Sequence, residues 1–257
     1  MQLDANDSIG NSVTYTASAL HGMVEIQGYL MTYTPDTNHF FEGDTITFNA
    51  IETPLIYGFY WPTVVFTGHI TVLPAQPIVS FTLSPINFPG AVNPVVMCAS
   101  SNQSVLVEFD GSGTLSTNSF PISETWYDGT NCILANAQSG SIFESLGSHT
   151  ITMSATDGVL TNCGSETFDV ITLGTAVTNL ENYVAQSGVP RKKERQLQRI
   201  LFKSAVWLDK GKERRAYNEL LDLQRKLQSR HDPVAPETTT NLVTGVQEIM
   251  NRLSTAN

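Results

Sequence analysis

An alternating pattern of apolar and polar side chains runs through residues 30–34, Leu30-Met31-Thr32-Tyr33-Thr34. The same alternation occurs before it in Met23-Val24-Glu25-Ile26 and after it in Thr45-Ile46-Thr47-Phe48. Because neighbouring side chains of a strand point to opposite faces, this period of two predicts half-buried β-strands. Gly, Pro, Asn and Asp separate the segments about every ten residues, which is typical of short antiparallel strands joined by turns.

The strand pattern continues to residue 172, through 63–73, 104–109, 149–154 and 167–172. This length suits two β-sandwich modules of Ig-like size. The proline-rich passage Leu73-Pro74-Ala75-Gln76-Pro77 marks the boundary between them. We therefore expect a first sandwich over residues 1–76 and a second over 77–174.

After Val177 the period changes from two to 3.6, which predicts helices. Four apolar stripes follow, interrupted by Gly188-Val189-Pro190, Lys210-Gly211 and the prolines 233 and 236. Their members are Val177, Leu180, Val184; Leu197, Ile200, Leu201, Ser204, Ala205, Leu208; Ala216, Leu220, Leu223, Leu227; and Leu242, Val246, Ile249, Met250, Leu253. The predicted fold class is multidomain: two all-β Ig-like sandwiches followed by a small all-α helical bundle over residues 175–257.

The charges are sorted along the chain. Residues 1–190 contain 16 acidic residues and no Lys or Arg, a net charge of −16, whereas residues 191–257 carry 14 basic and 8 acidic residues, a net charge of +6. The acidic part should repel nucleic acid. No apolar run reaches the roughly 18 residues of a membrane span, and the first residues do not resemble a signal peptide.

Residues 2–73 resemble a bacterial cadherin-like Ig module. The resemblance rests on the order of Leu3-Asp4-Ala5-Asn6-Asp7, Leu20-His21-Gly22, residues 30–35 and Gly43-Asp44-Thr45-Ile46-Thr47-Phe48. It implies that the first strand of the module, which should precede Leu3, is missing. Either the chain was cut there or another chain completes that edge.

The second module resembles the PKD-like and hyalin-repeat group of Ig-fold domains, through Phe109-Asp110-Gly111-Ser112-Gly113, Thr125-Trp126-Tyr127-Asp128-Gly129 and Leu146 to Met153. We expect Trp126 in the core between the sheets. The resemblance implies a disulfide between Cys98 and Cys163, with Cys132 as the alternative partner. Three unpaired buried thiols are the remaining alternative.

The helical tail resembles the FIMAH domain at the C-termini of bacterial surface and secreted proteins. The matching residues are Leu201-Phe202-Lys203, Trp207 to Gly211, Ala216 to Leu223 and the final stripe. The resemblance implies a non-catalytic domain with a role in protein–protein or matrix interaction, in an extracellular or cell-surface protein.

Several residues are candidate sites. Asp4, Asp7 and Asp36 are candidate calcium ligands, because calcium prefers carboxylate oxygens, and solvated turn aspartates are the alternative. Asp110 and Asp157 are expected to form turns, and His21 is expected to be structural. No histidine has a partner at a recognised ligand spacing, and no Cys/His cluster indicates zinc.

Two surface segments are candidate interfaces. Tyr57, Phe59, Tyr60 and Trp61 crowd one predicted loop and are expected to contact another domain or subunit, a sugar, or the end of the sandwich core. Arg191, Lys192, Lys193 and Arg195 open the second predicted helix, where positive charge opposes the helix dipole. They are expected to bind polyanions, lipid headgroups or another acidic partner, which would offset that cost, and a solvated helix start is the alternative.

These features predict a non-catalytic structural or interaction protein, since the chain contains no GxSxG, P-loop, HExxH or GxGxxG motif. No cofactor is required, although calcium is a candidate. The partners would be other protein chains, including copies of itself joined into filaments by strand addition and by contact of acidic body with basic tail. The alternative is a carbohydrate-binding or adhesive region of a larger secreted enzyme, with glycans or matrix polymers as ligands.

Overall fold

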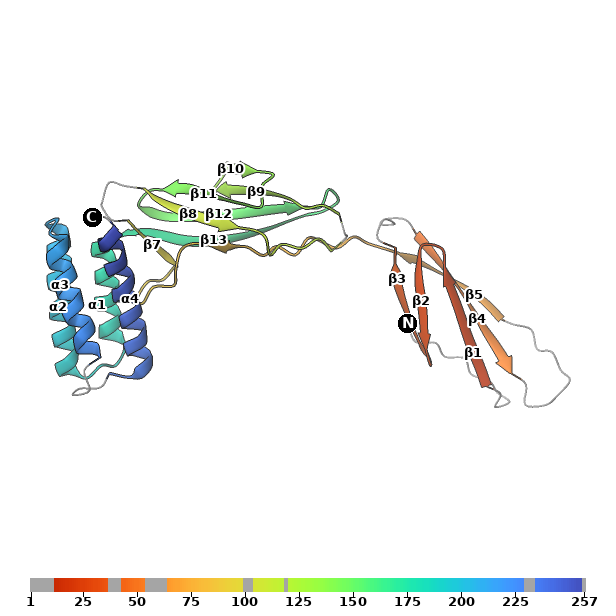
Figure 1. Cartoon of the computed structure of the whole chain (residues 1–257). Coiled ribbons are helices and arrows are strands. Elements are labelled where there is room, and N and C mark those ends of the chain that lie inside the picture. Colours follow the sequence, from red (N-terminus) through yellow and green to blue (C-terminus); the bar gives the residue numbers. More distant parts are fainter. Residues whose placement is uncertain are drawn as a thin grey trace. The chain divides into compact units, whose positions relative to one another are not determined.

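The computed structural model describes residues 12–36, 43–53, 64–98, 104–117, 120–228 and 234–255. Its residue contacts divide the chain into two compact units. Unit 1 holds residues 1–78 with the short segments 115–122 and 156–161, and unit 2 holds the rest. The predicted fold class is confirmed, because a β-rich region of several sheets is followed by four helices (Figure 1).

Unit 1 is built from two small antiparallel sheets. Their buried core is Met31 and Ile46, packed by partly buried side chains that include Tyr15, Val24 and Phe48. Exposure alternates along the β2 strand, as the period of two predicts. The first sheet has the order β1-β4-β5 and the second is a β2–β3 hairpin, with β1 at Ser12–Ala19, β2 at Gly22–Gln27, β3 at Leu30–Pro35, β4 at Gly43–Thr53 and β5 at Val64–Thr71.

Unit 2 begins with a sandwich of a five-stranded and a three-stranded sheet. The first has the order β10-β9-β12-β13-β7 and the second β11-β8-β6. The strands are β6 (Thr82–Leu83), β7 (Val95–Cys98), β8 (Val105–Asp110), β9 (Ser123–Asp128), β10 (Asn131–Ala135), β11 (Ser139–Glu144), β12 (Gly147–Thr156) and β13 (Thr161–Thr172). β7 runs parallel to β13.

Trp126 lies at the centre of the sandwich, as predicted. Its side chain is fully buried, and the indole N–H donates to the carbonyl of Ala137 at 2.8 Å. The rings of Phe109 and Phe81 pack against it with centroids 4.5 and 5.5 Å away. A buried indole needs a partner for its N–H, and the carbonyl of Ala137 supplies it.

Four helices follow without a linker. They are α1 (Leu173–Gln186), α2 (Arg191–Asp209), α3 (Glu213–Leu227) and α4 (Pro236–Thr255). Thr172 ends β13 and also caps α1, because its hydroxyl accepts a hydrogen bond from the Thr175 N–H at 3.1 Å. The predicted stripes are buried, including all the stripe residues named for α1, α3 and α4 and the first four named for α2.

The second sandwich and the helices share one hydrophobic core. Phe88, Val95 and Met97 belong to the same buried cluster as the inner faces of all four helices. Gly90 allows the loop before β7 to approach α1, since a Cβ there would lie 2.1 Å from the Asn179 carbonyl oxygen. The helices, which the sequence presents as a separate domain, thus form a single compact unit with this sandwich.

Candidate functional site

Several predicted site residues lie outside the described part of the chain. They are the calcium candidates Asp4 and Asp7 and the aromatic residues Tyr57, Phe59, Tyr60 and Trp61. The third calcium candidate, Asp36, is exposed, and its backbone N–H donates to the carbonyl of His21 at 2.9 Å. This bond continues the β2–β3 pairing by one residue.

The landmarks of the first module meet at the Asp44 carboxylate, which is almost fully buried. It accepts hydrogen bonds from the Tyr33 hydroxyl at 2.7 Å and from the backbone N–H groups of Leu20, His21 and Thr45. Burial alone would raise the pKa of Asp44, but these donors outweigh it and lower the pKa. Burial and the Asp44 carboxylate raise the pKa of Tyr33 to about 12.

Gly22 completes this arrangement, because a Cβ at that position would lie 2.5 Å from the Tyr33 ring. His21 contributes its backbone N–H and carbonyl to the cluster. Three separate landmarks of the sequence, His21-Gly22, Tyr33-Thr34-Pro35 and Gly43-Asp44, therefore belong to one hydrogen-bond network around the buried Asp44 carboxylate. His21 takes part in this network through its backbone, and the structural role expected of its side chain stays a prediction.

The predicted Cys98–Cys163 disulfide is wrong. Cys98 pairs with Thr172 in the β7–β13 register, nine residues along β13 from Cys163. At about 3.3 Å per residue the two cysteines are about 30 Å apart, whereas a disulfide requires Cα atoms about 4.4–6.8 Å apart. Cys132, the alternative partner, lies on β10 at the opposite edge of the sheet from β7.

Cys132 and Cys163 are exposed thiols without a disulfide, so the prediction of three buried thiols is also wrong. Cys98 alone is buried, and burial raises the pKa of its thiol.

The two aspartates predicted to form turns, Asp110 and Asp157, do so. Asp110 accepts from the Ser112 N–H at 2.9 Å, and Asp157 accepts from the N–H groups of Val159 and Leu160.

The basic segment at the start of α2 divides into two roles. Arg191, Lys192 and Arg195 are exposed, as an interface requires. Lys193 is buried, and its ammonium donates to the carbonyl of Lys226 at 2.9 Å, in the last turn of α3. Its assignment to an interface is therefore wrong, because this lysine caps the negative end of the neighbouring helix dipole.

A cluster of cations at the α2–α3 turn was missed by the sequence analysis. Lys210, Lys212 and Arg215 lie over the ring of Trp207, with their charged groups 5.7, 5.5 and 4.8 Å from its centroid. We call this set the turn cluster. Within the described residues none of the three cations forms an ion pair with a carboxylate. In the sequence, Lys210-Gly211 predicts a helix stop and belongs to the FIMAH-like match, and no prediction concerns Lys212 or Arg215.

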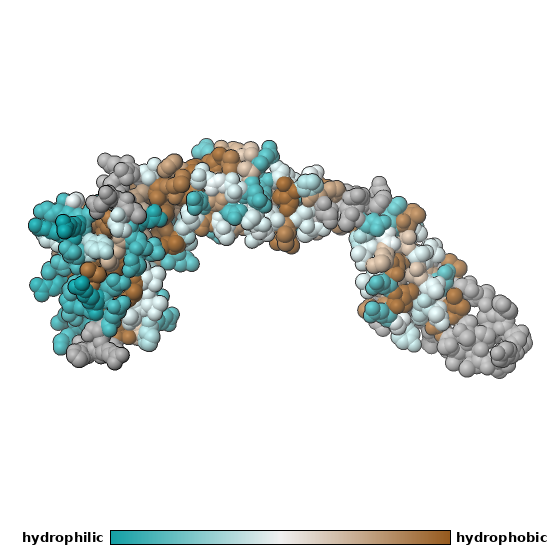
Figure 2. Space-filling view, viewed as in Figure 1, coloured by the Kyte–Doolittle hydropathy of each residue, from teal (hydrophilic) through white to brown (hydrophobic). Residues whose placement is uncertain are grey.

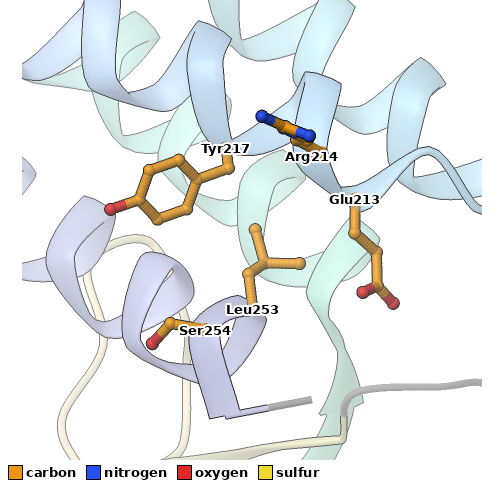
Figure 3. A pocket seen from close by; sticks show the side chains of 5 residues that line it. All are labelled: Glu213, Arg214, Tyr217, Leu253 and Ser254. Carbon is orange, nitrogen blue, oxygen red and sulfur yellow. The ribbon is translucent and has the colours of Figure 1, made fainter. Parts of the chain in front are cut away.

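A pocket of about 460 Å³ lies beside the same turn (Figure 3). Glu213, Arg214 and Tyr217 line it from the first turns of α3, and Leu253 and Ser254 line it from the end of α4. Its volume suits a small ligand or an inserted side chain. Among the described residues that line it there is no histidine or cysteine.

Two carboxylates are buried in the second sandwich. Glu124 is 6% exposed, and its Oε2 has no hydrogen-bond partner among the described residues. Burial, followed by the nearby charge of Asp110, raises the pKa of Glu124. Burial also raises the pKa of Glu144, with Asp128 acting in the same direction and His149 in the opposite one. Neither carboxylate could be predicted to be buried, because strands from different parts of the chain surround it and no local spacing records them.

No protein-family model matches the chain, and comparison with curated proteins gives no match. Among solved structures it is similar to the fibronectin(III)-like modules of Clostridium thermocellum CbhA, at 12% identity over 65% of this chain and 83% of that chain, with a TM-score of 0.29. It is also similar to the endo-fucoidan hydrolase MfFcnA4 from glycoside hydrolase family 107, at 14% identity and a TM-score of 0.28.

That second similarity covers 67% of this chain and 25% of the hydrolase, so the chain spans about a quarter of its length. A titin fragment, A168169, is similar at 14% identity over 64% of this chain and 86% of the fragment, with a TM-score of 0.19. Scores this low carry no functional argument. Among the described helices, none is both long and apolar enough to cross a membrane.

Proposed function

We propose that the protein is a non-catalytic structural and interaction protein of a bacterial cell surface or extracellular matrix, and that its α2–α3 hairpin binds acidic protein surfaces. The observation that carries this proposal is the charge of the hairpin. Residues 191–227 contain 12 basic and 5 acidic residues, a net charge of +7. Figure 2 shows hydrophilic side chains gathered over α2 and α3.

The turn cluster is the strongest candidate for the contact within this hairpin. Other cations already have partners: Lys203 pairs with Glu219, Lys226 pairs with Asp222, and Lys193 caps α3. The three cations of the turn cluster lie over one ring and repel one another, and among the described residues none of them forms an ion pair. An acidic surface that approached the cluster would relieve this repulsion and gain charge complementarity.

A second copy of the chain offers such a surface. Residues 1–190 carry 16 acidic residues and no basic ones, so the acidic part of one copy complements the hairpin of the next. A contact between two different surfaces of identical chains does not close on itself, and repeated contacts of this kind form filaments. β1 and β5 are the outer strands of the first sheet in the described part of the chain, and such edges accept added strands.

Sedimentation velocity of the full chain at about 50 and 500 mM NaCl tests the proposal, because salt screens exposed charges. K210Q/K212Q/R215Q removes three charges at the turn cluster. R191Q/K192Q/R195Q removes three charges from the other end of α2, about 28 Å away for a 19-residue helix, and serves as the matched control.

We expect the unmodified chain to associate at low salt and to dissociate at high salt. The turn variant should weaken association about tenfold, which corresponds to about 1.4 kcal/mol, and the control should weaken it much less. A chain that stays monomeric at low salt would contradict the proposal. Equal weakening by both variants would contradict the assignment of the contact to the turn cluster.

A further inference from the structure

Three side chains converge where the second sandwich changes from one sheet to the other. Asp128 ends β9, Glu144 ends β11 and His149 lies near the start of β12. One ligand-type atom from each lies within 4.8 Å of the others. The Nδ1 atom of His149 is 2.9 Å from Glu144 Oε2 and 3.9 Å from Asp128 Oδ1. We call these three residues the inter-sheet site.

The other ring nitrogen of His149 contacts the backbone, and this contact holds the orientation of the ring. Its Nε2 lies 2.8 Å from the carbonyl oxygen of Ser145. Because a carbonyl can only accept a hydrogen bond, Nε2 is the donor in this contact, and Nδ1 is the ring atom left for a metal ion held with the two carboxylates. The ring also stacks on Phe168, with centroids 5.7 Å apart. Histidines that bind metals typically donate their second N–H to a backbone carbonyl in this way.

Glu144 provides the second, independent observation. Its side chain is only 6% exposed, and its Oε1 atom is buried without a hydrogen-bond partner among the described residues. A buried carboxylate oxygen without a partner is unfavourable. A cation bound by both carboxylate oxygens of Glu144, together with Asp128 and His149, would supply the interaction that Oε1 lacks.

We infer that the inter-sheet site binds one divalent transition-metal ion of the zinc type. An imidazole nitrogen with two carboxylates matches the ligands of zinc, whereas calcium takes oxygen ligands. Tetrahedral bonds of about 2.0–2.2 Å place neighbouring ligand atoms about 3.4 Å apart, and the distances of 2.9 and 3.9 Å from His149 Nδ1 to the two carboxylates lie on either side of this value. The Asp128 side chain is 27% exposed, which leaves an approach for the ion and for a water ligand.

The ion would act as a cross-link between the sheets. Glu144 belongs to the β11-β8-β6 sheet, whereas Asp128 and His149 belong to the β10-β9-β12-β13-β7 sheet. The ion would fix the short crossover from β11 to β12. Because it binds only the folded state, it would stabilise the chain by mass action.

Isothermal titration calorimetry of the chelator-treated full chain with Zn²⁺ tests the inference, together with thermal unfolding at each Zn²⁺ concentration. We expect one Zn²⁺ per chain, and a Tm about 5–10 °C higher at 100 times the dissociation constant. D128N and E144Q should each reduce Zn²⁺ affinity at least tenfold. D128N changes the most exposed ligand and keeps the shape of the side chain, so it serves if E144Q fails to fold.

E108Q is the matched control, since Glu108 is an exposed carboxylate on β8 of the same sandwich. It should bind Zn²⁺ as the unmodified chain does. The inference is overturned if no stoichiometric Zn²⁺ binding occurs, which would leave Glu144 and His149 as a plain ion pair. It is also overturned if D128N binds as tightly as the unmodified chain, or if E108Q loses as much affinity as D128N.

Discussion

Individual buried carboxylates of this protein have opposite environments. Asp44 accepts hydrogen bonds from four groups and has a lowered pKa, whereas Glu124 has an oxygen without a partner among the described residues and a raised pKa. Gly111 packs directly against this carboxylate, because a Cβ at residue 111 would lie 2.4 Å from Glu124 Oε2. Such close packing leaves little room for water. Burying the charged form of Glu124 therefore lowers the stability of the folded state.

Glu124→Gln should stabilise the chain at neutral pH. The pKa of Glu124 is higher in the folded than in the unfolded state, so its contribution favours folding at low pH and is lost as the pH rises through the folded pKa. We expect Tm to rise by about 2–4 °C at pH 7, as for about 1 kcal/mol in a chain of this size. Below about pH 4 the difference in Tm should vanish, since Glu124 is then protonated in both the folded and the unfolded chain.

Thermal unfolding by circular dichroism from pH 3 to pH 8 measures this, with E108Q as the control for loss of an exposed carboxylate. A variant that is less stable at pH 7 than the unmodified chain would show that Glu124 makes a favourable contact as a charged group.

At the scale of elements, helix ends are stabilised across the bundle as well as within each helix. α2 begins at Arg191 with three basic residues, and its N-cap residue Pro190 provides no side-chain hydrogen bond, which is an unfavourable combination by itself. α3 ends beside it, and Lys193 reaches the carbonyl of Lys226 there. The positive charge of Lys193 is thus unfavourable at the N-terminus of α2 but favourable at the C-terminus of α3.

Lys193→Met should remove this cap while retaining most of the apolar stem. We expect the free energy of unfolding to fall by about 0.5–1.5 kcal/mol, the usual net contribution of one hydrogen bond. Lys192→Met, its exposed neighbour, should change stability by less than about 0.5 kcal/mol. Guanidinium unfolding compares the two variants. Equal effects of the two would show that the cap contributes nothing.

The helices were the elements most accessible to prediction, because their apolar stripes repeat within one segment. Leu220, Leu223 and Leu227 are buried as their spacing predicts. The role of Lys193 could not be predicted from its segment, since its partner lies 33 residues away on an antiparallel helix. Asp128, Glu144 and His149 were missed for the same reason: strand pairing and a sheet crossover bring them together, and no local spacing records it.

At the scale of the whole molecule, the two compact units do not follow the change of period in the sequence. The period changes after β13, yet Val95 and Met97 of β7 share a core with all four helices. Residues 95–98 lie outside the predicted strand segments, and their helical partners in this core are more than 70 residues away. The charge boundary at residue 190 also falls inside unit 2, so each copy of that unit carries both signs.

Negative-stain electron microscopy of the full chain at about 50 and 500 mM NaCl tests the proposed assembly most directly. If the acidic part of one copy binds the basic hairpin of the next, particles several chains long should form at low salt and separate into single chains at high salt. Single chains at both salt concentrations would contradict the account.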